Sequence, residues 1–124
     1  MKRAVVAIIK NPEGKILMGK RGDSGKYSLP AGGIEDKEHP RDALAREIKE
    51  ETGLDLKKAK LVKIHMDKKV LVYLYECECS GEIDHTKDPD QEFCEKPDYH
   101  NIIEKYTDLH IPAKHNVALK WVVG

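Results

Sequence analysis

The sequence predicts a protein of the α/β class, of the α+β kind, in which a mixed β-sheet packs against helices. A short run rich in Val and Ile at residues 4–9 has the composition of a strand, and a second extended apolar run follows at residues 16–18. A helical segment follows at residues 40–52, and residues 61–66 and 70–79 then alternate as two further strands. Strands before and after a helix favour a mixed sheet with a helix on each side.

The first strand, residues 4–9, is continuously apolar, which is typical of a strand buried on both faces. Turn residues at 11–14 separate it from residues 16–18, so the two strands are expected to form a hairpin. Gly32 and Gly33 predict an irregular backbone, because adjacent glycines permit positive φ and close approach to a ligand.

The helix is expected to begin at Pro40, directly after His39, because proline fits the first helical position. Leu44 and Ile48 share one face of this helix. Gly53 is expected to end it as the C-cap.

Beyond residue 80 the periodic spacing of apolar residues is weaker. Residues 81–112 show little periodicity and carry three prolines, which is compatible with a functional ordered loop or with a surface excursion. Val117 and Trp121 give residues 117–123 the apolar face of a closing helix.

The length of 124 residues is typical of one domain, so we expect a single domain spanning residues 1–124. The 22 basic and 22 acidic residues cancel, and nothing global favours nucleic acid or membrane as a partner. The apolar run at the N-terminus stops before Lys10, too early for a signal peptide or a membrane span. We expect a cytoplasmic protein that is a monomer or a homodimer.

The three cysteines are too few, and odd in number, for a disulfide framework. Cys77 and Cys79 alternate along a strand and so point to the same face. They are interpreted as reduced packing thiols; the alternative is a zinc site completed by His85 or Cys94, whose spacing fits no familiar finger or ribbon.

The helix concentrates acidic residues. Glu47, Glu50 and Glu51 stand at i, i+3 and i+4, which places three carboxylates on one face. Their mutual repulsion is relieved by a hard divalent cation, and carboxylate oxygens are ligands that magnesium prefers. Taken alone, the helix also fits a solvated face, because Asp42, Arg46 and Glu50 form an i,i+4 ladder of alternating sign.

A longer pattern decides between these interpretations. The spacing G-x5-E-x7-R-E-U-x-E-E-x-G-U, where U is aliphatic, is matched at Gly32, Glu38, Arg46, Glu47, Ile48, Glu50, Glu51, Gly53 and Leu54. At average residue frequencies, a chance match in a chain of this size is of order one in ten million. The segment resembles the Nudix box, so the chain is similar to the Nudix hydrolases, whose fold is an α/β/α sandwich with the box as loop–helix–loop.

The resemblance implies a role for each matching residue. Glu47, Glu50 and Glu51 would bind Mg²⁺, with Mn²⁺ as an alternative, and the carbonyl of Ala31 or Gly32 would add a backbone oxygen. Glu47, Glu51 and Arg46 would form the catalytic set, with Glu47 the candidate base. Arg46 would hold the glutamates by salt bridges, Glu38 would pair with Arg46, and Gly53 would keep its capping role.

Residues outside the box complete the expected site. The family often takes a fourth acidic ligand from a late loop, where Asp90, Glu92 and Glu95 are available and Glu92 is preferred. Arg21 stands where related enzymes place a cation against the substrate phosphates, although a solvated strand end explains it as well. Gly32 and Gly33 are expected to approach the substrate.

The implied reaction is hydrolysis of a diphosphate bond in a nucleotide, most similar to the branch that converts nucleoside triphosphates, oxidised ones included, to monophosphate and pyrophosphate. Lys114 replaces the asparagine that reads oxidised purine there, and Tyr73 lies near a tyrosine of dinucleoside-polyphosphate hydrolases. The alternatives are hydrolysis of a dinucleoside polyphosphate or of ADP-ribose, a non-catalytic nucleotide-binding domain, and an isoprenoid-diphosphate isomerase. Tyr27, Phe93, Tyr99 and Tyr106 are candidates for stacking on a base.

Overall fold

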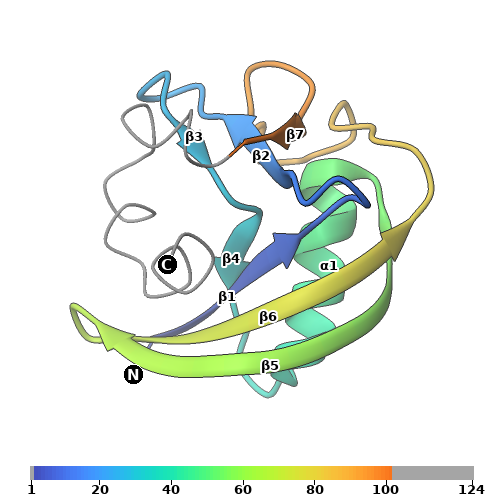
Figure 1. Cartoon of the computed structure of the whole chain (residues 1–124). Helices are drawn as coiled ribbons and strands as arrows, with labels where there is room; N and C mark the ends of the chain where they lie inside the picture. Colours follow the sequence, from blue (N-terminus) through green and yellow to red (C-terminus); the bar gives the residue numbers. More distant parts are fainter. Residues whose placement is uncertain (1, 102–124) are drawn as a thin grey trace.

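The structure is a computed structural model that describes residues 2–101 (Figure 1). In chain order its elements are β1 (Lys2–Ile9), β2 (Ile16–Lys20), β3 (Tyr27–Ser28), β4 (Ala31–Gly33), α1 (Pro40–Thr52), β5 (Asp55–Asp67), β6 (Val70–Ser80) and β7 (Asp98–His100). The closing helix expected at residues 117–123 lies outside the described residues, as do Tyr106 and Lys114.

The strands form a mixed sheet and a smaller antiparallel one. The larger sheet has the order β4-β1-β6-β5, with β1 parallel to β6 and the other neighbours antiparallel. The smaller sheet has the order β3-β2-β7. Figure 1 shows α1 crossing behind the larger sheet. The predicted mixed sheet covered by a helix is confirmed, and the described part of the chain contains no helix with the length and apolarity needed to cross a bilayer.

Strand β1 is the centre of the molecule, because its two faces supply two different cores. Val5, Ala7 and Ile9 pack with α1, whereas Val6 and Ile8 pack on the opposite face of the sheet. All five are buried, as expected for a continuously apolar strand. Each buried Val or Ile stabilises the fold by roughly 1.5–3 kcal/mol, so β1 is a major source of stability.

The hairpin expected from residues 4–9 and 16–18 is wrong. The turn forms, with the Asn11 N–H donating to the Lys15 carbonyl at 3.0 Å, but the two segments pair only through an isolated bridge between Lys10 and Ile16. Both edges of β1 are already occupied, by β4 and by β6. Strand β2 therefore pairs with β3 and β7 in the second sheet instead.

The ends of α1 follow the sequence signals. The His39 Nδ1 atom accepts a hydrogen bond from the Arg41 N–H at 3.2 Å, and Pro40 is the first helical residue. Gly53 adopts a left-handed φ of 76°, and its N–H donates to the Lys49 carbonyl at 2.9 Å. These limits place the box glutamates in the last two turns of the helix.

Strand β5 begins at Asp55, several residues earlier than expected, and contains register shifts between Leu56 and Lys58 and between Leu61 and Lys63. Irregular pairing of this kind breaks the simple alternation from which strands are predicted. Within residues 81–101 the structure adds the short strand β7.

We expect Gly53→Ala to lower the free energy of unfolding by more than Gly14→Ala. Both glycines have similar positive φ values, 76° and 78°, which cost an L-residue roughly 1–2 kcal/mol. A Cβ at Gly53 would also lie 2.6 Å from the Asp84 carbonyl oxygen, whereas a Cβ at Gly14 would meet nothing within 4 Å. Urea denaturation of the two variants measures the difference; equal losses would contradict the packing contribution at Gly53.

Candidate active site

The backbone of β4 lies directly against the carboxylate of Glu47. A Cβ on Gly32 would overlap the Glu47 side chain, whereas a Cβ on Gly33 would meet nothing within 4 Å. Both glycines pair in register with β1, and neither has a positive φ. The irregular backbone expected here is therefore wrong: Gly32 is needed for space, because any side chain there would displace Glu47.

A pocket of about 200 Å³ opens between β4, α1 and the loop that follows β6. Its lining consists of Ala31, Gly32, Gly33, Glu47, Glu51, Asp88, Asp90 and Glu92. Every charged residue in this lining is acidic. Two of the three box glutamates thus face carboxylates that are about forty residues further along the chain.

Glu51 is the more buried of the two helix glutamates that line the pocket, with 4% of its surface exposed, whereas Glu47 is only partly buried. Its Oε2 atom accepts a hydrogen bond from the Ala31 N–H at 3.0 Å. Burial, and then the neighbouring charges of Glu47 and Glu92, raise the pKa of Glu51 to about 10. Without a cation in the pocket, Glu51 therefore favours its protonated form.

Glu47 also lines the pocket, and its pKa is raised less than that of Glu51. Burial raises the pKa of Glu47 to about 7, although the Arg46 guanidinium opposes this shift. Its Oε1 atom accepts a hydrogen bond from Arg46 Nη1 at 2.8 Å. The other oxygen, Oε2, accepts none from the described residues.

Arg46 connects the helix to the segment before it. Its Nε and Nη2 atoms donate to the two oxygens of Glu38, both at 3.0 Å, and Nη2 also donates to the Gly33 carbonyl at 3.0 Å. This bidentate pair holds the pKa of Glu38 at about 2, well below its ordinary value. Arg46 thus links Glu38, Glu47 and the backbone of β4, while the roles expected for these residues stay predictions.

Glu50 is placed differently from its two neighbours. It does not line the pocket, and its Oε2 atom lies 3.6 Å from Arg46 Nη1. Its side chain is 29% exposed. Its expected role as a metal ligand stays a prediction.

The acidic candidates for a fourth ligand all lie in the loop after β6. Glu92, the preferred fourth ligand, lines the pocket together with Asp90, whereas Glu95 does not. Sequence reasoning missed Asp88, which lines the pocket and is only 3% exposed. Its one local signal is an aspartate directly before a proline, which is ordinary turn chemistry.

Arg21, the expected phosphate-binding cation, is engaged with acidic residues. Its Nη1 atom lies 2.6 Å from Glu92 Oε1, and its Nε and Nη2 atoms donate to Asp23 at 3.0 Å. The structure thus joins two residues that the sequence suggested for different tasks. Arg21 borders the site through Glu92 and does not line the pocket.

Among the aromatic candidates, Phe93 is a core residue. It is 2% exposed, and its ring occupies the space beside Gly19 that a Cβ would fill. Tyr99 is partly buried against the core around α1, and Tyr27 makes an edge-to-face contact with His100 at 5.0 Å. Phe93 therefore does not stack on a base, and its expected candidacy is wrong.

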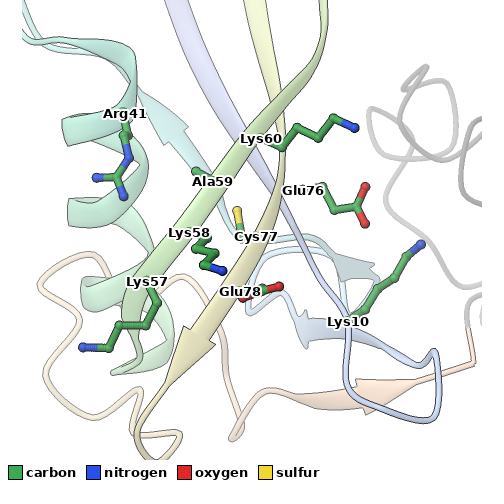
Figure 2. A pocket seen from close by; sticks show the side chains of 9 residues that line it. All are labelled: Lys10, Arg41, Lys57, Lys58, Ala59, Lys60, Glu76, Cys77 and Glu78. Carbon is green, nitrogen blue, oxygen red and sulfur yellow. The ribbon is translucent and has the colours of Figure 1, made fainter.

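A second, larger hollow of about 730 Å³ lies over β5 and β6 and is mainly basic (Figure 2). Its cations are Lys10, Arg41, Lys57, Lys58 and Lys60, and Glu76 and Glu78 also line it. Lys58 and Lys60 stand opposite these glutamates in the strand register. Because β5 is an edge strand, such lysines also protect it from pairing with other chains. None of the box glutamates lines this hollow.

The acidic pocket suits a hard divalent cation. The fit rests on the donor set, several carboxylates of which Glu51 and Asp88 are almost fully buried, and on the space that Gly32 leaves beside Glu47. Among residues 2–101, no group of three His, Cys, Asp or Glu residues has ready-made metal-ligand geometry. Two candidate ligands, Glu47 and Glu92, are instead held by Arg46 and Arg21. The alternative zinc site is not formed by Cys77, Cys79, His85 and Cys94.

Comparison with known proteins identifies the family. The NUDIX domain model matches residues 1–117, so the chain belongs to the Nudix family. A MutT-like protein from Streptomyces ambofaciens is 28% identical over 85 residues, which are 67% of this chain and 55% of that protein. An RNA pyrophosphohydrolase from Hydrogenovibrio crunogenus is 46% identical over 48 residues, which are 39% of this chain and 29% of that protein. The matches thus span about half or less of these relatives.

Solved structures show the same fold. A MutT structure from work on Aliivibrio salmonicida and Vibrio cholerae has a TM-score of 0.79 at 19% identity, covering 98% of this chain and 96% of that one. An ADP-ribose pyrophosphatase from Streptococcus suis has a TM-score of 0.75 at 23% identity, covering 98% and 87%. At such identities the likeness concerns the fold alone.

We expect Gly32→Ala to lower kcat/KM for the substrate about a hundredfold, because a misplacement of Glu47 by about 1 Å has that effect on a positioned reaction. Gly22→Ala is the control, since Gly22 does not line the pocket, has no positive φ, and its Cβ would make only an ordinary contact with Cys94 at 3.8 Å. Steady-state kinetics on both variants, with thermal unfolding to confirm that each is folded, measures the effect. Similar activities in the two variants would contradict the role assigned to Gly32.

We expect Glu51→Gln to raise Tm in the presence of EDTA, with a gain that grows as the pH rises from about 5 to about 9. The pKa of Glu51 is raised from 4.5 to about 10, so the folded protein binds a proton that the unfolded chain releases. Wild-type stability therefore falls as the pH rises through this window, whereas glutamine does not ionise. Thermal scans at both pH values, with Glu50→Gln as the control outside the pocket, test this. A pH-independent loss of Tm would contradict it.

Proposed function

We propose that the chain is a hydrolase that cleaves a diphosphate bond in a nucleotide, with Mg²⁺ as its cofactor and Mn²⁺ as a substitute. The observation that carries this proposal is the pocket in which Glu47 and Glu51 face Asp90 and Glu92 beside the Gly32 backbone. Carboxylates gathered in this way suit a cation that shares its coordination sphere with phosphate oxygens. The match to the NUDIX domain over residues 1–117 supports the reaction class.

The substrate we favour is a nucleoside triphosphate, oxidised or not, which is converted to a monophosphate and pyrophosphate. The MutT-like relative supports this branch of the family. A cytoplasmic location is part of the proposal and agrees with the free thiols of Cys77, Cys79 and Cys94. Both a monomer and a homodimer are compatible with it.

Glu47, Glu51 and Glu92 would hold the cation, with the Gly32 carbonyl as an added oxygen. Once bound, the cation would neutralise charge on the phosphate oxygens and lower the pKa of its water. The chain's own contribution is geometric: Arg46 fixes one oxygen of Glu47, and the second oxygen is free to orient and deprotonate the attacking water. The Ala31 N–H fixes Glu51 in the same way.

A second candidate substrate is an RNA with a diphosphate bond at its end. Two observations favour it: the 46% identity to part of an RNA pyrophosphohydrolase, and the basic hollow of Figure 2, whose lysines suit a chain of phosphates. ADP-ribose is a third test substrate, because an ADP-ribose pyrophosphatase shares the fold.

A screen of canonical and oxidised nucleoside triphosphates, 5′-triphosphorylated RNA, dinucleoside polyphosphates and ADP-ribose, each with Mg²⁺ and with EDTA, tests the proposal. Pyrophosphate release that requires Mg²⁺ and is fastest with a free nucleoside triphosphate supports the favoured substrate. Faster turnover of RNA moves the assignment to the second candidate. Binding of nucleotides without release of any phosphate product would show a non-catalytic domain.

We expect Glu47→Gln and Glu51→Gln each to lower turnover at least about a hundredfold at saturating Mg²⁺, since loss of acid–base help alone costs ~10²–10⁴-fold. Asp42→Asn removes the same charge from the exposed first turn of α1 and is the matched control. Its rate should stay within about twofold of wild type. Wild-type turnover in either glutamine variant would overturn the assigned roles.

A further inference from the structure

One buried carboxylate has no part in the mechanism given above. Asp88 is only 3% exposed, and it forms no ion pair with any described residue. Burying a carboxylate without a cation is costly unless its oxygens accept hydrogen bonds. The contacts of Asp88 therefore indicate why the chain places an acid there.

Both oxygens of Asp88 accept hydrogen bonds from the backbone of the loop that follows it. The Asp90 N–H donates to Oδ1 and the Glu92 N–H donates to Oδ2, both at 3.0 Å. The Gln91 side chain closes the same turn by donating to the Asp88 carbonyl at 2.6 Å. Residues 88–92 are thus wrapped around the Asp88 carboxylate, and Asp90 and Glu92 line the pocket from this turn.

The far end of the turn is attached to β2. The Gly22 N–H donates to the Glu92 carbonyl at 3.2 Å, and the Cys94 N–H donates to the Lys20 carbonyl at 2.9 Å. The buried ring of Phe93 fills the space beside Gly19. With this end fixed, the conformation of residues 88–92 decides where the Asp90 and Glu92 carboxylates point.

We propose that Asp88 is a positioning residue that folds residues 88–92 so that Asp90 and Glu92 face Glu47 and Glu51 across the cation site. The proposal rests on the function proposed above. It also explains the residue type: an aspartate offers two acceptor oxygens to two N–H groups, whereas an asparagine offers one oxygen and an NH₂ group that cannot accept. An alanine would leave both N–H groups without their partner.

The test uses the full chain and Mn²⁺ as the probe. Calorimetry should show Mn²⁺ binding weakened at least about tenfold in Asp88→Ala and by an intermediate factor in Asp88→Asn, as is usual when a residue supporting metal ligands is lost. In the metal-free protein, hydrogen exchange followed by NMR should show faster exchange of the Asp90 and Glu92 amides in both variants.

Asp84→Ala is the matched control. Asp84 caps a turn in the same segment, where its Oδ1 atom accepts hydrogen bonds from the Thr86 N–H and hydroxyl, but it does not line the pocket. This variant should expose the Thr86 amide and leave Mn²⁺ affinity unchanged.

Unchanged Mn²⁺ affinity in the Asp88 variants would overturn the proposal. Weakened affinity with unchanged exchange at Asp90 and Glu92 would also overturn it, because Asp88 would then act as a direct ligand. If Asp88→Ala does not fold, Asp88→Asn decides by the same two measurements. The proposed function is tested separately by a Glu47→Gln/Glu51→Gln double variant: persistent Mn²⁺ binding there would move the metal site elsewhere, while the exchange data would still report on the loop.

Discussion

The close approach of β4 to the last turns of α1 is the constraint on which the site depends. It requires a residue without a side chain at position 32, because the carboxylate of Glu47 occupies that space. Once the two backbones are this close, the Ala31 N–H reaches Glu51 and the Gly33 carbonyl reaches Arg46. A strand that pairs with the central β1 thus fixes the helix that carries the acidic groups.

The same closeness creates an electrostatic cost. Carboxylates that face one another in a small pocket repel, and burial removes the water that would screen them. Two arginines at the border offset part of this cost: Arg46 holds Glu38 and Glu47, and Arg21 holds Glu92. Glu51, which has no arginine partner among the described residues, retains the largest upward pKa shift of the carboxylates. Gathering these carboxylates therefore lowers the stability of the folded chain, and a bound divalent cation would reduce their mutual repulsion.

The sequence predicted the features that depend on local rules. The limits of α1 follow from proline at its start and glycine at its end, and the burial of β1 follows from its unbroken apolar run. The box spacing placed Glu47, Glu51, Arg46 and Glu38 near one another because an α-helix and a short loop leave little freedom.

Features that depend on which distant segments pair or pack together could not be predicted from local sequence rules. The expected hairpin failed because β1 had two better partners, one of them more than sixty residues away. Gly32 was interpreted as a conformational glycine, since nothing local reveals that Glu47 fills its empty side. The pairing of Arg21 with Glu92 could not be predicted because a contact over about seventy residues leaves no spacing signal. Asp88 has local hydrogen-bond partners, but its burial in the pocket depends on packing against residues about forty positions earlier. The burial of Phe93, which excludes stacking on a base, depends on its packing against Gly19 and has no local signal in the sequence.

The segment after β6 is attached at two distant points. The Asp84 N–H donates to the Thr52 carbonyl at the end of α1, and the Cys94 N–H donates to the Lys20 carbonyl at the end of β2. A stretch of chain tied to the helix at one end and to a strand at the other cannot shift as a whole without breaking one of these contacts. The carboxylates of Asp90 and Glu92 are therefore held relative to those of α1 by both attachments, and a change at either attachment is expected to alter the width of the acidic pocket.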